Sequence, residues 1–211
     1  VWYQYLNQPR NVPDVCRGRM DGMKGSYLGP SYSDNEIEIV LEGNGATYRR
    51  MGHKEVIRWT AEQLANEKVV GWFQGRMEFG PRSLGARSIL GDPRSTKMQS
   101  TMNLKIKYRE SFRPFAPSVL REAVSQFFEL DADSPYMLLV APVRQEHRRR
   151  PGPEEEKLFG IEKLKVPRSS IPAVTHVDYS ARVQTVRADD NGPYYDLIAE
   201  FARRTGCPIL V

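Results

Sequence analysis

The sequence predicts an α/β fold in which a sheet of mixed strands is covered by helices. Three stretches carry this prediction. Apolar residues recur at helical spacing over 53–68, with charged residues on the other side. The compact apolar run 69–73 is typical of a buried strand that ends at Gly75. Residues 175–186 alternate between valine and polar side chains, which favours a strand or hairpin.

A second helix is expected over 193–204, because signals for both of its ends are present. Asn191 and Pro193 stand near its start, Gly206 follows its end, and Pro208 begins a final strand. Its apolar stripe is formed by Leu197, Ile198 and Phe201. This helix should cover one face of the sheet.

The remaining elements follow from shorter patterns. A short helix should begin at Asp34, which acts as its N-cap, and a further helix should span 95–107 with Ser95 or Thr96 as cap. The other expected elements are a strand over 115–120, a helix over 121–130 and a strand over 137–143. The apolar residues of these last three segments are expected in the core.

Length and composition set outer bounds on the function. With 211 residues, of which 40% are hydrophobic, the chain fits one domain, or one domain with an appendage. The 31 basic and 26 acidic residues give a net charge of +5, which favours local anion sites over a polycationic arm, so nucleic acid is not required as a partner. Cys16 and Cys207 have no motif spacing and are expected as reduced thiols, with Cys207 in the core. No membrane-spanning or signal-peptide pattern is present, so a soluble cytoplasmic protein without a membrane partner is expected.

The stretch 71–120 is the most informative part of the chain. Gly75, Gly80, Gly85 and Gly91 allow repeated bends, and cations alternate there with short apolar runs. Each single cation could be a solvated surface residue, but the whole set favours an anion site, because arginine forks and lysine point charges together suit an oligophosphate. The cations are Arg76, Arg82, Arg87, Arg94, Lys97, Lys105, Lys107, Arg109 and Arg113.

Four motifs resemble one family. GRMEFGPRSLGARSIL, followed by MNLKIKYRESFRPFAPSVL, resembles the signature of the carboxy-terminal domain of the O-carbamoyltransferases that modify nodulation factors and antibiotics. SPYMLLVAPV at 134–143 and HVDYSARVQTV at 176–186 are similar to the same family. The resemblance covers the chain from about Tyr27 to Val211.

The resemblance implies a YrdC-like twisted mixed sheet covered by helices, in a domain that forms carbamoyl adenylate from carbamoyl phosphate and ATP. Mg²⁺ would accompany the ATP, and pyrophosphate would be released. A metal-containing amino-terminal domain, absent from this chain and expected as its partner, would then transfer the carbamoyl group to an acceptor hydroxyl. Residues 1–25 would be the end of that upstream domain and a linker, and 26–211 the carboxy-terminal domain. That domain would stop short of an Asn-Thr-Ser-Phe-Asn segment that belongs to the family's site.

The resemblance also assigns site residues. Lys107 and Arg113 match a Lys and Arg pair that binds phosphate in this fold, and we expect them to be catalytic. Arg182 is carried over from the family motif as a contact to phosphate or carbamoyl oxygen. Arg82 and His176 are further expected substrate or nucleotide contacts, and for Arg82 the reason is local, because Pro81 fixes the backbone before it and Gly80 and Gly85 let its loop fold tightly. At the position of Tyr179 the family motif usually has glycine, so the backbone shape there could differ.

His176 and Asp178 are two residues apart, and on a strand they would merely share a face. We expect His176 to pack or to hydrogen-bond substrate more than to act as a general base, because the nucleophile in adenylation is already an anion. No metal site is expected, because His53, His147 and His176 lack ligand spacing.

Two other classes of function remain open. The chain could be a YrdC-like RNA- or nucleotide-binding module without catalysis, given its basic character, or a non-catalytic docking domain that shapes its partner's acceptor site. The charged stretch 147–157 is expected to be a solvated surface loop or a lid.

Overall fold

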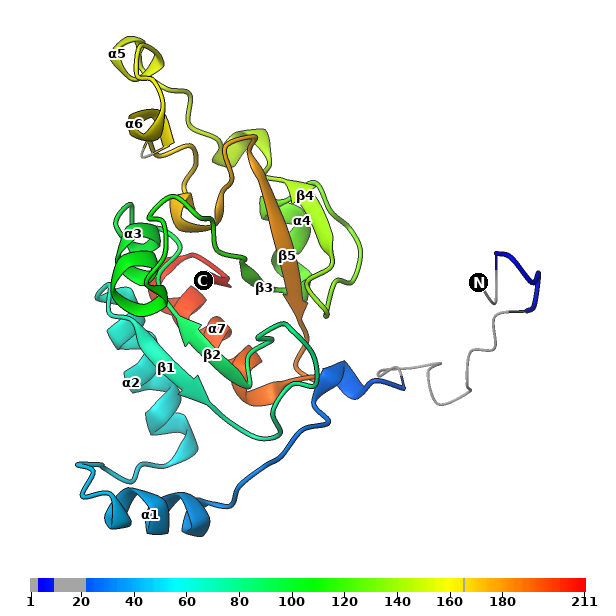
Figure 1. The fold of residues 1–211 in the computed structure, drawn as a ribbon, viewed down its shortest axis with the longest axis vertical. Helices are drawn as coiled ribbons and strands as arrows, with labels where there is room; N and C mark the ends of the chain where they lie inside the picture. Colours follow the sequence, from blue (N-terminus) through cyan, green and yellow to red (C-terminus); the bar gives the residue numbers. More distant parts are fainter. Residues whose placement is uncertain (1–3, 10–21, 165) are drawn as a thin grey trace.

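The computed structural model describes residues 4–9, 22–164 and 166–211. It confirms the predicted α/β class, because helices surround a two-stranded sheet and a mixed four-stranded sheet (Figure 1). Most of the linker predicted before residue 26, together with Cys16, lies outside the described residues.

The strands are short and the helices vary in length. The strands are β1 (Val70–Phe73), β2 (Arg87–Leu90), β3 (Ser118–Leu120), β4 (Leu139–Pro142), β5 (Ser180–Val186) and β6 (Ile209–Leu210). The α-helices are α1 (Asp34–Gly43), α2 (His53–Ala65), α3 (Met98–Met102), α4 (Val124–Phe127), α5 (Pro153–Glu156), α6 (Ile161–Leu164) and α7 (Gly192–Thr205). Single turns are η2 (Lys24–Ser26), η4 (Arg121–Ala123), η5 (Gln145–His147) and η6 (Pro172–Val174), and η3 (Asn103–Lys107) is π-helical.

The four-stranded sheet has the order β4-β5-β3-β6. β5 pairs with β3 in parallel and with β4 antiparallel, and β6 closes the other side antiparallel to β3. Arg182 stands opposite Val140 and Gln184 opposite Ser118 in this register. β5 is therefore an inner strand with neighbours on both sides.

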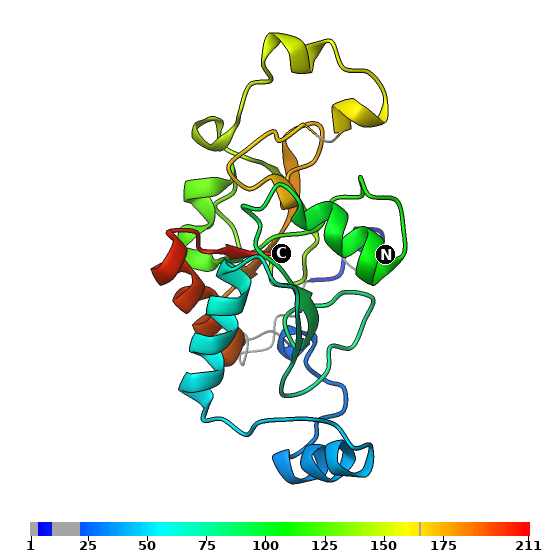
Figure 2. The ribbon, with the colours of Figure 1, turned by 90° about the vertical axis from the view of Figure 1, so that its left-hand side faces the viewer.

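The core lies between this sheet and the helix pair α2 and α7, which lie side by side in both views (Figures 1 and 2). The inward stripe of α7 includes Tyr194, Leu197, Ile198 and Phe201, all at most 1% exposed. On the facing side of α2, the side chains of Ile57, Ala61 and Leu64 are buried. Both helices thus have the amphipathic pattern that the sequence predicts.

The predicted ends of α7 are confirmed. The Asn191 side chain caps the helix by accepting a hydrogen bond from the Tyr194 N–H, and Gly206 ends it with φ +74° and an N–H bond to the Ala202 carbonyl. The predicted cap of α1 is wrong by one residue. Ser33 is the N-cap and forms a capping box with Glu36, so Asp34 is already helical.

Several predicted elements are shorter than expected. The helix expected over 95–107 begins only at Met98, because residues 92–95 form a turn in which the Asp92 carboxylate accepts the Arg94 N–H. It continues beyond Met102 as the π-turn η3. No local pattern predicts β2, which pairs with β1 within the cationic stretch.

The strand expected over 137–143 is an edge strand and mostly not core. Met137 has a positive φ of 54°, so β4 starts only at Leu139, and Leu138 and Val140 are 71% and 64% exposed. Only one side chain of β4, that of Ala141, is buried. The apolar composition predicted burial, but the edge position leaves one face of the strand uncovered.

Two segments project from the body at opposite ends of the long axis (Figures 1 and 2). One is α1, none of whose residues is buried. The other is the arm, which we define as residues 149–164 and 166–168 and which carries α5 and α6. The Arg149 N–H bonds to the Arg168 carbonyl at its base.

Cys207 is buried, as predicted. Within the described ranges, no helix combines the length and the apolar character needed to cross a bilayer.

Gly85 provides a test of this packing. It has φ +99°, and a Cβ atom there would lie 2.1 Å from the buried ring of Tyr194. We expect Gly85→Ala to lower the free energy of unfolding by about 3 kcal/mol or more, because backbone strain and overpacking add. Chemical denaturation measures this. Gly43→Ala is the control, since open space surrounds that position in α1, and it should not lower the free energy of unfolding. Equal stability of the two variants would contradict the packing described here.

Candidate functional site

Arg82 lies in the loop that joins β1 to β2, residues 74–86. Its guanidinium Nε is buried and has no hydrogen-bond partner among the described residues. Leaving a buried donor of a charged group unpaired costs roughly 1–3 kcal/mol or more. Such an atom is a natural donor to an oxygen of a ligand.

Arg182 on β5 is the neighbouring cation. Partial burial lowers the pKa of Arg182, and the positive charge of Arg82 lowers it further. Neither arginine forms an ion pair with a carboxylate of the described part of the chain. Two like charges that lie close together and lack an acidic partner favour binding of an anion between them.

A buried hydrogen bond explains why these two arginines meet. The Gln184 amide Nε2 donates to the Leu84 carbonyl at 2.9 Å, and the Tyr27 hydroxyl donates to the same oxygen at 2.7 Å. Arg182 precedes Gln184 by two residues on β5, so both side chains lie on the same face of the sheet. Arg82 precedes Leu84 by two residues, so the bond between Leu84 and Gln184 ties the loop that carries Arg82 to the strand that carries Arg182.

Arg182 lines a cavity of about 420 Å³, which we call the arginine cavity. His176, Asp178 and Ser180 contribute polar atoms to it, and Pro114 with its next two residues forms another part of the wall. This volume falls in the range of roughly 300–1,000 Å³ typical of small-molecule sites.

A second cavity of about 240 Å³, the arm-side cavity, adjoins the first, since His176 and Pro114 line both. Arg113 lies in its wall, together with Phe112, Val177 and residues from the arm such as Leu164. His176 thus lines both the cavity that contains Arg113 and the cavity that contains Arg182. Both cavities have mixed walls, in which apolar residues stand beside charged and polar ones.

Lys107 is exposed at the last position of η3, and it is not among the residues that line either cavity. The next residue, Tyr108, turns the chain out of the helix with φ +48°. Arg113 pairs with Glu110 at 2.9 Å, and its backbone carbonyl accepts from the Asn103 amide. The catalytic roles expected of Lys107 and Arg113 stay predictions.

His176 and Asp178 lie in a turn before β5, and not on a strand as the sequence suggested. Asp178 Oδ1 accepts from the Ser180 hydroxyl at 2.6 Å and the Ser180 N–H at 3.0 Å, and it lies 3.1 Å from His176 Nδ1. Hydrogen bonds from Ser180, and to a lesser extent the contact with His176, lower the pKa of Asp178 to about 2. The carboxylate therefore fixes the His176 ring, whose other nitrogen is not engaged by Asp178.

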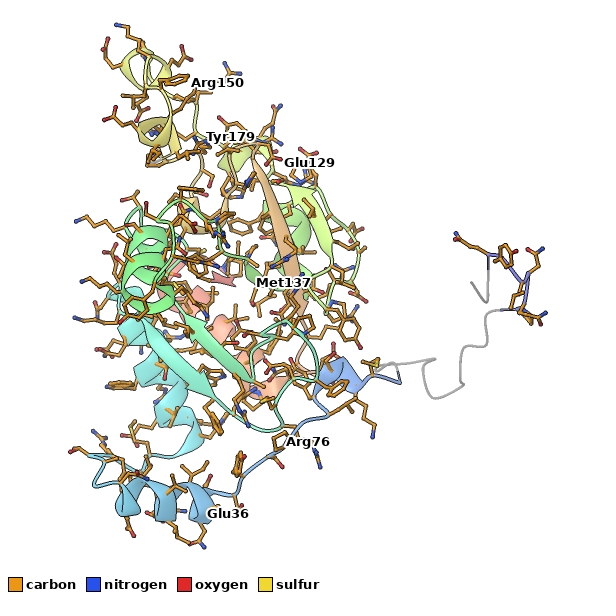
Figure 3. All side chains as sticks on the ribbon, in the orientation of Figure 1. Glu36, Arg76, Glu129, Met137, Arg150 and Tyr179 are labelled. Carbon is orange, nitrogen blue, oxygen red and sulfur yellow. The ribbon has the colours of Figure 1, made fainter. Side chains whose placement is uncertain are left out.

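Tyr179 adopts the left-handed conformation, with φ +64°. It stands where the resembling family usually has glycine, so the turn has the backbone shape that glycine adopts most easily. Its ring lies 5.4 Å from the Arg148 guanidinium and its hydroxyl 3.4 Å from the Arg149 carbonyl. Figure 3 shows Tyr179 next to the base of the arm.

Four cations of the stretch 71–120 bind backbone or side-chain groups of the chain itself, and they line neither of the two cavities. Arg87 donates to the carbonyls of Gln74 and Gly75, at 2.7 and 3.1 Å, and stacks on the Phe73 ring. Arg76 donates to the Gly29 carbonyl at 2.9 Å. Both hold the β1–β2 loop.

The other two stabilise the following segment. Arg94 forms a bidentate pair with Asp92, whose side chain is 3% exposed. Arg109 donates to the Asn103 side chain at 2.6 Å and lies over the Phe115 ring. Among the described residues, Arg82 differs from these four because its Nε lacks an acceptor.

The described residues do not form a cluster of side chains that could bind a resident metal ion. Within the described ranges, no three acidic, histidine or cysteine side chains are grouped closely enough to hold an ion. Asp178 is the carboxylate that lines the arginine cavity. Mg²⁺ prefers several oxygen ligands, and it would have to obtain most of them from a bound polyphosphate.

Sequence reasoning missed two residues that build the site, Gln184 and Glu78. Gln184 is 2% exposed and Glu78 is 5% exposed. A glutamine inside the apolar strand pattern RVQTV was the available signal, because a buried amide needs partners. Glu78 had no comparable signal among the many charged residues around it.

The turn before β5 yields a pH-dependent prediction. Ser180→Ala removes one of the hydrogen bonds that stabilise the ionised form, so it should raise the pKa of Asp178 from about 2 toward the ordinary 3.8. Carbon-13 NMR titration of the Asp178 carboxyl measures this. Because the pKa is depressed, this carboxylate stabilises the fold above about pH 3.8, and that stabilisation is lost as the pH falls through about 2. Identical titration of wild type and variant would contradict the hydrogen-bond assignment.

Comparison with known proteins identifies the family. A family model described as Carbamoyltransferase C-terminus matches residues 61–211. The whole chain aligns with an uncharacterized protein from Synechocystis sp. at 57% identity, and the alignment covers 34% of the length of that relative.

Two further relatives have more informative names. Nodulation protein NolNO of Sinorhizobium fredii is 42% identical over 88% of the chain and 25% of its own length. The 3'-hydroxymethylcephem-O-carbamoyltransferase of Amycolatopsis lactamdurans is 37% identical over 78% of the chain and 26% of its own length. The chain thus spans between a quarter and a third of these relatives, and it belongs to the carbamoyltransferase C-terminal family.

Proposed function

We propose that this chain is the part of a carbamoyltransferase that binds ATP and carbamoyl phosphate and forms carbamoyl adenylate. The observation that carries the proposal is the buried, unpaired Nε of Arg82 in a loop that a buried hydrogen bond ties to the strand of Arg182, whose pKa the charge of Arg82 lowers. The printed name of the Amycolatopsis relative, an O-carbamoyltransferase, supports the type of group transferred.

The electrostatics of the pair suit a phosphate group. Guanidinium groups donate in a planar fork, and two such forks can hold oxygens that lie in different planes. An anion between the two arginines would offset their mutual repulsion, so its binding is favoured beyond the individual hydrogen bonds. Pyrophosphate or the polyphosphate chain of ATP meets these requirements.

The two adjoining cavities suit the two parts of a nucleotide. The arm-side cavity presents Phe112, Leu164 and Val177, whose apolar surfaces fit a nucleobase. The arginine cavity would then hold the phosphates beside Arg182, with His176 as a hydrogen-bonding contact that lines both cavities. Arg82 does not line this cavity and would donate to the phosphates from the β1–β2 loop. Arg113, in the wall of the arm-side cavity, and Lys107, at the end of η3, would act on the phosphate groups of the substrates.

The reaction itself needs positioning more than proton transfer. Water hydrolyses carbamoyl phosphate to carbamate and inorganic phosphate. A carbamate oxygen then attacks the α-phosphorus of ATP, forming the bond of carbamoyl adenylate while the bond to pyrophosphate breaks. Negative charge grows on phosphate oxygens in this step, and fixed guanidinium groups stabilise it without reorganisation. Mg²⁺ bound to ATP would supply further charge neutralisation. An upstream domain, as expected from the family, would complete the transfer to an acceptor.

The first test concerns binding. Arg82→Ala and Arg182→Ala should each weaken ATP binding by about 30-fold or more, since removal of one partner from a hydrogen-bonded charge pair costs roughly 2 kcal/mol or more. Isothermal titration calorimetry measures this. The control Arg150→Ala removes one exposed positive charge on the arm (Figure 3) and should leave the affinity unchanged.

Equal weakening in all three variants would mean that only net charge matters. That result would favour the alternative of a non-specific nucleic-acid-binding module, whose affinity falls steeply with salt.

The second test concerns catalysis. Lys107→Ala and Arg113→Ala should slow carbamoyl-adenylate formation on the order of 100-fold, as expected when a donor to a developing charge is removed. Pyrophosphate release that depends on carbamoyl phosphate reports the rate in the complete protein. Near-normal rates in both variants would remove these residues from the mechanism.

A further inference from the structure

Glu78 is a buried carboxylate in the β1–β2 loop, with a relative exposure of 5%. Its Oε1 accepts three backbone hydrogen bonds, from Leu84 at 2.7 Å, Ala86 at 2.8 Å and Arg87 at 3.2 Å. A buried carboxylate costs several kcal/mol unless it is paired or well hydrogen-bonded. Backbone donors of the same loop provide this compensation here.

These bonds close the loop around Arg82. Glu78 lies before the arginine and its three donors lie after it, so residues 79–83 form an excursion whose two ends are joined by one side chain. Gly80 and Gly85 take φ values of +139° and +99°, which allow the chain to turn on both sides of the arginine. The position of Arg82 therefore depends on how these ends are held.

The residues on both sides of Glu78 are held by backbone hydrogen bonds. The Met77 N–H bonds to the Pro30 carbonyl at 2.9 Å, and the Phe79 N–H bonds to the Ser26 carbonyl at 2.7 Å. Residues 77–79 thus connect the segment 26–30, through backbone N–H groups, with the segment 84–87, through the Glu78 carboxylate. The second of these segments also carries the Leu84 carbonyl that Gln184 binds.

Glu78 does not have the properties of a general base. It lines neither the arginine cavity nor the arm-side cavity, and the oxygen that faces the loop is already occupied by three N–H donors. Its effect on chemistry has to pass through the loop.

We propose that Glu78 is a positioning residue for Arg82, which holds the guanidinium beside Arg182 before an anion binds. The inference rests on the proposed function, because it takes the arginine pair as the phosphate-binding group. Preorganisation of this kind raises affinity, since less freedom is lost on binding.

The test is a double-mutant cycle with inorganic pyrophosphate as the probe. Glu78→Ala should weaken pyrophosphate binding about 10-fold or more, whereas Glu78→Gln keeps a carbonyl oxygen that accepts the same three N–H groups and should stay within about threefold of wild type. In an Arg82→Ala background, Glu78→Ala should cause no further loss of affinity, because the residue acts through the arginine. The midpoint temperature of thermal unfolding, measured in parallel, should be lowered by Glu78→Ala in both backgrounds.

The thermal readout separates a general folding defect from positioning. If Glu78→Ala does not fold, Glu78→Asp replaces it, since the shorter carboxylate keeps the charge but cannot reach all three donors. Glu78→Asp should likewise lower the affinity for pyrophosphate when Arg82 is present, and it should not lower it further in the Arg82→Ala variant.

Three results would overturn the inference. Additive losses of affinity in the double variant would show that Glu78 does not act through Arg82. A loss in Arg82→Ala with wild-type binding in Glu78→Ala or Glu78→Asp would remove the role of Glu78 and leave the proposed function intact. Wild-type protein that binds no pyrophosphate would remove both.

Discussion

The hydrogen bond from the Gln184 amide to the Leu84 carbonyl is the interaction on which the candidate site depends. It joins the β1–β2 loop to an inner strand of the four-stranded sheet, across a sequence separation of 100 residues. Ser118 on β3 donates to the other end of the same amide at 2.7 Å, so the amide orientation is set from the sheet side. Because Gln184 is buried, loss of either bond would leave a polar group unsatisfied, and the contact is expected to hold whenever the sheet is formed.

The consequence is an arrangement that is unfavourable for the free protein. Arg82 and Arg182 repel each other, and one guanidinium N–H of Arg82 has no acceptor. Backbone contacts of the loop compensate for this, among them the bonds to Glu78 and the carbonyls held by Arg87. Strain and unpaired groups of this kind concentrate at functional sites, where a ligand relieves them.

Local signals in the sequence predicted the elements whose ends are capped and whose faces are periodic. α7 is the clearest case, since Asn191, the stripe around Leu197 and Gly206 all act within one helix. β4 could not be predicted as an edge strand, because an apolar run does not show how many neighbours a strand has. The alternating pattern of 175–186 predicts a strand or hairpin, whereas 176–179 form a turn, because the bonds that Asp178 accepts from Ser180 are not visible in such a pattern.

The candidate site was predictable only as a set of residue types. Arg82 and Arg87 look alike in the sequence, yet one faces a second arginine and the other donates to backbone carbonyls. Family resemblance indicates Arg182, and the loop residues Pro81, Gly80 and Gly85 indicate Arg82, but neither signal includes the buried amide of Gln184 or the buried carboxylate of Glu78. Contacts between segments 100 residues apart leave no mark in local spacing, and three-dimensional geometry was needed to separate ligand-facing cations from structural ones.

The central claim is that one pair of arginines forms the phosphate-binding group of this domain. The most direct measurement is a crystal structure of the protein with ATP or pyrophosphate bound. The account predicts a phosphate group between Arg82 and Arg182, with an oxygen within about 3 Å of the Arg82 Nε. Phosphate bound elsewhere, for example along α2 and α7, with Arg82 Nε still unpaired or facing only water, would contradict it.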